Sequence, residues 1–80
     1  MNKDELRRVV LETLTDIAPE VDPAEIKDAV RLRHQVDLDS MDWLRFLAAL
    51  EKKLAVTVPE ADYKKLGTLN DVVGYLATRR

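Results

Sequence analysis

The sequence contains no cysteine, and among its 80 residues it has one histidine, two glycines and three prolines. Without cysteine the chain has no disulfide scaffold, no thiolate metal ligand and no cysteine nucleophile. Any thiol chemistry must therefore come from an attached group. Both glycines, Gly67 and Gly74, lie in the last quarter of the chain, so no glycine-rich turn near the middle supplies an oxyanion hole.

Length and charge narrow the class of protein further. A chain of 80 residues makes one domain, residues 1–80, and buries only about 60–65% of its unfolded surface. That leaves too little core for a deep catalytic cleft and favours a carrier, adaptor or binding module over an enzyme. The net charge of −2 disfavours nucleic-acid binding. No apolar run could span a bilayer, and the charged N-terminus argues against a signal peptide, so we expect a cytoplasmic protein without stable membrane insertion.

Caps and hydrophobic periodicity predict four helices and therefore an all-α fold. In the first helix Asn2 is the predicted N-cap, and Pro19 ends the segment. A long connection follows, with a short helical turn at 22–25. We expect Ile26 and Val30 to attach this connection to the core.

The second helix is predicted over 40–54 and a short third helix over 60–66. Gly67 ends the short helix and suits a left-handed helix end. Thr68 caps the last helix, in which Gly74 costs about 1 kcal/mol relative to alanine; close packing would explain that glycine. The predicted architecture is a small four-helix bundle with three longer helices and one short helix.

The second helix has two apolar faces. One is the predicted core stripe, formed by Trp43, Phe46, Leu47, Leu50 and Leu54. The adjacent face carries Met41, Leu44 and Ala48, which the core stripe does not need. This second face is either a contact surface for partners or a sign that the core wraps further round the helix.

The only serine, Ser40, lies where the connection ends and the second helix begins. Asp39 is a good N-cap and Asp42 is placed three residues later, so Ser40 would occupy the first helical position with its hydroxyl free. A helix N-terminus favours a phosphate there, although Asp37, Asp39 and Asp42 oppose it. Taken alone, however, the Asp-Ser pair is typical of an ordinary helix start.

Catalytic and metal-binding interpretations are weaker. A nucleophilic Ser40 would need a base, and the single histidine, His34, is separated from it by loop without any spacing that implies contact. Asp37, Asp39 and Asp42 resemble part of a calcium loop, but the required glycine and terminal glutamate are missing. We therefore predict no catalytic residue and no metal site.

From 36 to 77 the chain resembles the acyl carrier protein family. Asp39-Ser40-Met41 is close to the family's Asp-Ser-Leu attachment motif. Val56-Thr57-Val58-Pro59 matches its extended link, and Thr68-Leu69 matches the start of its last helix. The first helix is similar only as a generic amphipathic helix, so the order of the three motifs carries the resemblance.

The resemblance implies a single carrier domain with 4′-phosphopantetheine, taken from coenzyme A by a phosphopantetheinyl transferase, on Ser40. Asp39 and Met41 would be its motif neighbours. The arm's thiol would hold acyl groups as thioesters, and the core near Trp43, Phe46 and Leu47 would shelter an acyl chain. Acyl-loading and acyl-transfer enzymes are the implied partners of a monomeric carrier. On the second helix the expected partner-binding positions are Met41, Leu44, Arg45, Ala48 and Lys52.

The chain departs from the family pattern in two places. Asp37 stands where the family usually has glycine, and Arg45, Lys52 and Lys53 stand where housekeeping fatty-acid carriers have acids. Since complementary charge selects partners, we predict a specialised carrier that serves dedicated enzymes of lipid or secondary-metabolite synthesis. An aminoacyl or peptidyl carrier has the same fold and serine and stays open. An unmodified helical interaction module is the third interpretation.

Overall fold

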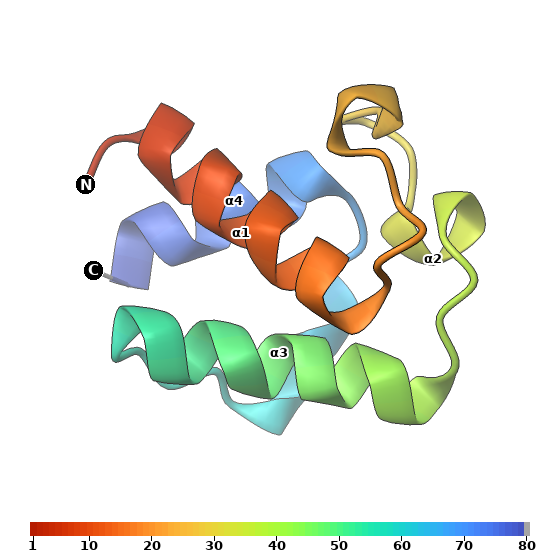
Figure 1. Cartoon of the computed structure of the whole chain (residues 1–80). Helices are drawn as coiled ribbons and strands as arrows, with labels where there is room; N and C mark the ends of the chain where they lie inside the picture. The colour runs from red at the N-terminus through yellow and green to blue at the C-terminus, as the bar shows by residue number, and fades with distance from the viewer. Residues whose placement is uncertain (80) are drawn as a thin grey trace.

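A computed structural model describes residues 1–79 as a bundle of helices (Figure 1). The three longer helices are α1 (Lys3–Ile17), α3 (Ser40–Leu54) and α4 (Leu69–Arg79). Short helical segments connect them: η1 (Pro23–Glu25), α2 (Leu32–Gln35) and η2 (Glu60–Lys65). Helix α1 packs against both α3 and α4, and the two ends of the chain lie on the same side of the bundle. The predicted all-α fold with three longer helices is confirmed.

The longer helices begin where side-chain caps were predicted. Asn2 Oδ1 accepts a hydrogen bond from the backbone N–H of Glu5 at 2.8 Å. At the start of α4, Thr68 Oγ1 accepts from the N–H of Asp71 at 3.0 Å, and the Asp71 carboxylate accepts from the N–H of Thr68 at 3.1 Å. These caps satisfy donors that the first turn of a helix leaves free.

The core forms between the apolar faces of α1, α3 and α4. All five predicted core residues of α3 are buried, and the rings of Trp43 and Phe46 lie 5.2 Å apart. Thr13 of α1 is the one polar side chain in the described part that is fully buried, and its hydroxyl donates to the carbonyl of Val9 at 2.7 Å. Buried apolar residues of the flanking helices include Leu6, Val10, Leu14, Leu69, Val72 and Leu76.

The connection between α1 and α3 differs from the prediction at Val30 and in containing the short helix α2, which was not predicted. Ile26 is buried as expected, but the prediction for Val30 is wrong because its side chain is 40% exposed. Polar contacts hold this part of the connection instead. Gln35 accepts from the N–H of Lys27 at 2.7 Å and donates to the carbonyls of Lys27 and Val30 at 2.8 and 2.7 Å.

An ion pair also fastens the connection to α1. Arg7 Nη2 lies 2.8 Å from Asp28 Oδ1, and this hydrogen bond lowers the pKa of the Asp28 carboxyl. The backbone carbonyl of Asp28 accepts from the N–H of Asn70, at the start of α4, at 3.1 Å. The connection is thus held to both α1 and α4 before the chain reaches the first residue of α3.

The two glycines behave differently from the sequence prediction. Gly67 does not adopt a left-handed conformation; the left-handed residue is Ala55, with φ of 53°, at the end of α3. The carbonyl of Gly67 accepts from the N–H of Leu32 at 2.8 Å, and a Cβ at this position would lie 3.1 Å from the Arg31 guanidinium. In the described structure a Cβ at Gly74 meets nothing within 4 Å, so close packing does not explain that glycine.

None of the residues of η2 is fully buried, but Tyr63 packs partly against the core and polar side chains join the segment to α4. Asp62 accepts a hydrogen bond from the Tyr75 hydroxyl at 2.6 Å and pairs with Arg79 at 3.2 Å and Lys65 at 3.3 Å. The Arg79 guanidinium also lies 4.7 Å from the centre of the Tyr75 ring. The hydrogen bond from Tyr75, followed by the contacts of Lys65 and Arg79, lowers the pKa of Asp62.

None of the helices in residues 1–79 has the length and apolar character needed to cross a membrane.

Candidate functional site

Ser40 is the first residue of α3, as the spacing of its neighbours predicted. Asp39 has an extended backbone, and its Oδ1 accepts from the N–H of Asp42 at 2.8 Å. The carbonyl of Asp39 accepts the first helical bond, from the N–H of Trp43, at 3.0 Å. Asp39 is therefore the cap, and the cap does not use the hydroxyl of Ser40.

The Ser40 side chain is exposed. Within residues 1–79, no donor or acceptor forms a hydrogen bond with its hydroxyl. The hydroxyl stands at a helix end where backbone N–H groups point outward and carry partial positive charge. It is accessible to a second protein, at a helix end that favours a phosphate, whereas the exposed Asp37 and Asp39 nearby oppose one.

Two buried side chains hold the segment that leads to Ser40. Val36 and Leu38 are each only 6% exposed, whereas Asp37 and Asp39 between and after them are exposed. This alternation turns every second side chain into the core, as in an extended strand. The alternation of apolar and acidic residues over 36–39 is the sequence signal for this segment, and helical periodicity does not detect it.

Asp37, which stands where the family pattern has glycine, does not need a glycine-like backbone conformation. Among the described non-glycine residues only Ala55 has positive φ, so Asp37 adopts a backbone conformation that any residue tolerates. The aspartates contribute local negative charge beside Ser40. Asp42 is partly offset by Arg45, whose Nη1 lies 3.4 Å from its carboxylate.

The geometry around Ser40 is not that of a nucleophile and its base. His34 is exposed on α2, and no hydrogen bond joins it to Ser40 in the described residues. The same part of the chain contains no group of three or more histidine, cysteine, aspartate or glutamate side chains placed to hold a metal.

The second apolar face of α3 is open to solvent. Met41 is 68% exposed, Leu44 is 46% exposed, and Ala48 is exposed as well. The core therefore does not wrap round this side of the helix, and the interpretation of this face as part of the core is wrong. Arg45 and Lys52 share the face and are exposed.

A sequence profile described as "Phosphopantetheine attachment site" matches residues 6–76, which is most of the chain and all of the region around Ser40. The chain belongs to the acyl carrier protein family. It is 31% identical over 77 residues to an acyl carrier protein of Wolinella succinogenes, covering 96% of this chain and 95% of that one. An acyl carrier protein of Campylobacter curvus is 34% identical over 73 residues, covering 91% and 88% of the two chains.

A solved acyl carrier protein from Enterococcus faecalis has the same fold. It superposes with a TM-score of 0.77 over the full length of both chains at 17% sequence identity. The profile and the relatives together establish the prosthetic group of this family member as 4′-phosphopantetheine.

The residues present fit that group. A phosphodiester needs an accessible hydroxyl, and Ser40 supplies one at a helix N-terminus where the first-turn N–H groups favour a phosphate. Asp39 occupies the cap position, so modification of Ser40 would not remove a helix cap. Trp43, Phe46 and Leu47 are packed and buried, so an acyl chain could enter between them only if the core opened.

Proposed function

We propose that Ser40 bears the 4′-phosphopantetheine arm and that the protein carries acyl groups as thioesters without catalysing a reaction itself. The observation that carries the proposal is the exposed, unengaged hydroxyl of the only serine, set at the first position of α3. Within a chain matched by a phosphopantetheine attachment profile, this hydroxyl has the access that attachment requires and lies at a helix N-terminus. We further propose that the carrier works as a cytoplasmic monomer.

Attachment requires little of the carrier beyond presenting the hydroxyl. The Ser40 oxygen forms a phosphodiester while the pyrophosphate bond of coenzyme A breaks, releasing adenosine 3′,5′-bisphosphate. The serine proton passes to a base on the transferase, because no group in residues 1–79 accepts a hydrogen bond from this hydroxyl. Once attached, the arm supplies the thiol that this cysteine-free chain lacks.

Partner enzymes are proposed to bind the exposed face of α3. Met41 and Leu44 provide apolar area within the first two turns after Ser40, and Ala48 continues it. Apolar side chains this exposed, grouped on one face beside the modification site, are typical of a protein contact surface.

We also propose that these partners are dedicated enzymes rather than the general fatty-acid synthesis machinery. Arg45 and Lys52 give the middle and end of the face positive charge. Complementary charge steers association, and juxtaposed like charges reject wrong partners. A ketoacyl synthase of general fatty-acid synthesis should bind this carrier weakly, and tight binding would overturn the assignment to dedicated enzymes.

The experiment that tests the carrier function is loading of the arm-bearing protein. Adenylating enzymes specific for fatty acids and for amino acids are each offered the wild-type protein and Ser40→Ala. The proposal expects a fatty-acyl thioester on the wild type, released by hydroxylamine, and none on the variant. Loading by the amino-acid enzymes alone would make the protein an aminoacyl carrier. Loading of Ser40→Ala would contradict the role of Ser40.

A further inference from the structure

Five exposed residues form one stripe along α3, which we call the α3 stripe: Met41, Leu44, Arg45, Ala48 and Lys52. At 100° per residue they fall within an arc of about 100°, so the face predicted to be adjacent to the buried stripe lies on the opposite side of the helix. The α3 stripe begins one residue after Ser40, so a protein that reaches the attachment site would contact it.

The acidic side chains of α3 and of its cap are used inside the protein. Asp39 accepts the N–H of Asp42, and the Asp42 carboxylate faces Arg45. Glu51 accepts the N–H of Val58, in the link that follows the helix, at 3.3 Å. These contacts direct the carboxylates toward neighbouring groups of the protein, and none of the three acidic residues belongs to the α3 stripe.

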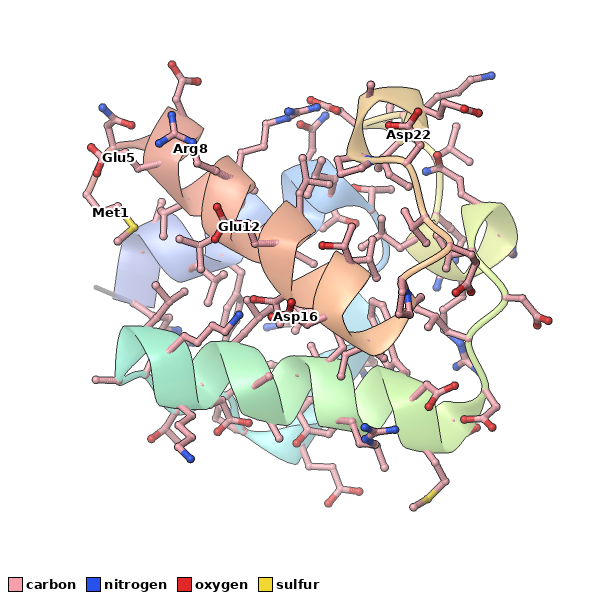
Figure 2. All side chains as sticks on the ribbon, viewed as in Figure 1. Met1, Glu5, Arg8, Glu12, Asp16 and Asp22 are labelled. Atoms are coloured by element: carbon pink, nitrogen blue, oxygen red, sulfur yellow. The ribbon has the colours of Figure 1, made fainter. Side chains whose placement is uncertain are left out.

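The basic side chains of α3 divide into two groups. Lys53 turns toward α1, where its Nζ lies 3.0 Å from Asp16 and 3.1 Å from the Thr13 hydroxyl. Figure 2 shows Asp16 on the side of α1 that faces α3. Lys52 forms no ion pair with any described residue. Arg45 is 65% exposed, and its 3.4 Å pair with Asp42 is of the solvated kind that contributes little.

We infer that the α3 stripe docks on an enzyme surface that is acidic opposite Arg45 and Lys52 and apolar opposite Met41 and Leu44. This inference rests on the proposed carrier function, since it concerns how partners approach the arm on Ser40. The partner is a protein, because the apolar pair needs a fitted depression and the two cations need fixed carboxylates.

The spacing along the helix defines the orientation of the partner. At 1.5 Å per residue, Arg45 lies about 8 Å and Lys52 about 18 Å along the axis from Ser40. At the Ser40 end, Asp37 and Asp39 are exposed and negative. The charge of the surface therefore changes sign along the helix, and a partner docked in reverse would place like charges together.

A charge exchange on both molecules tests the inference. The probes are two forms of one purified ketoacyl synthase: one with basic residues around its pantetheine entrance, and one with four of these replaced by glutamate. The arm-bearing wild-type carrier should bind the glutamate form about tenfold more tightly. Arg45→Glu/Lys52→Glu should reverse this preference. Leu44→Ala should weaken binding to both forms by a similar factor.

Matched variants elsewhere on the surface provide the controls. Arg8→Glu/Lys27→Glu makes the same charge change away from α3, and Arg8 points outward on α1 in Figure 2. Val30→Ala removes an exposed apolar side chain that is not part of the α3 stripe. Both controls should keep the wild-type preference and affinity.

Each outcome separates the docking inference from the carrier function. The arm is first verified on every variant by its mass increment. If the proteins carry the arm but bind both forms equally, bind neither form, or show the same preference after Arg45→Glu/Lys52→Glu, the docking inference is wrong and the carrier function stands. If no arm can be attached at Ser40, the carrier function itself fails.

Discussion

Replacing Asp39 by alanine removes the N-cap of α3 without touching the hydroxyl that it leaves free. The lost contact is the 2.8 Å hydrogen bond from the N–H of Asp42 to Asp39 Oδ1. Loss of such a cap costs about 0.5–2 kcal/mol, and loss of the charge at the helix N-terminus about 0.3–1 kcal/mol. Removing the Asp39 charge also relieves its repulsion with Asp37 and Asp42, and this gain offsets part of the lost interaction with the helix N-terminus. We therefore expect Asp39→Ala to lower the free energy of unfolding by about 1–2 kcal/mol.

Asp39→Asn separates the two contributions, because asparagine keeps the accepting oxygen and loses the charge. With a shift of about 4–8 °C in Tm per kcal/mol for a domain of this size, Asp39→Ala should melt about 4–16 °C below the wild type. The decrease in Tm of Asp39→Asn should be at most about half of the decrease for Asp39→Ala. Thermal unfolding followed by circular dichroism at neutral pH measures both. If Asp39→Ala melts with the wild type, or if Asp39→Asn falls as far as Asp39→Ala, the capping argument is refuted.

Two further predictions concern stability. Gly74→Ala should raise the free energy of unfolding by about 0.5–1 kcal/mol, because a Cβ there meets nothing within 4 Å; urea unfolding checks this, and a destabilised variant would reveal a constraint absent from the contacts. Asp62 has a lowered pKa in the folded protein because Tyr75 donates to its carboxylate. The contribution of Asp62 to the free energy of unfolding is therefore present above about pH 4, the ordinary aspartate pKa. It is lost as the pH falls through the lowered pKa of the folded protein. Asp62→Asn should be less stable than the wild type at neutral pH and approach it in acid, whereas a pH-independent difference would contradict this assignment.

The longer helices could be predicted because their determinants are local in sequence. Asn2, Asp39 and Thr68 each cap a backbone N–H three residues later, and the core stripe of α3 follows the helical repeat. The position of Ser40 was predictable for the same reason. Its hydroxyl is free because the preceding residue, Asp39, is a better placed cap.

The connection between α1 and α3 depends on contacts that sequence periodicity does not contain. The helix α2 was missed because it has only four residues, of which Leu32 alone is buried. The N–H of Leu32 is paired with the carbonyl of Gly67, far along the chain. Val30 looked like a core residue by type, but the hydrogen bonds of Gln35 hold its carbonyl while its side chain faces solvent.

Lys52 rather than Lys53 could be placed on the docking surface from the helical repeat, but the partner of Lys53 needed the structure. In the fold, Asp16 lies 37 positions earlier in the chain and pairs with Lys53, while Lys52 stays on the exposed side. The hydrogen bond from the N–H of Val58 to Glu51 is shorter in range, but it too joins α3 to a segment outside the helix. Side-chain direction thus decided which charges a partner meets.

The central claim is that Ser40 bears the prosthetic arm, and intact-mass measurement tests it most directly. The purified protein lacking the arm is incubated with coenzyme A and a phosphopantetheinyl transferase, beside Ser40→Ala whose fold is verified by circular dichroism. The account predicts one phosphopantetheine increment on the wild type and none on the variant. An increment on Ser40→Ala, or no increment on the wild type with several transferases, would contradict it.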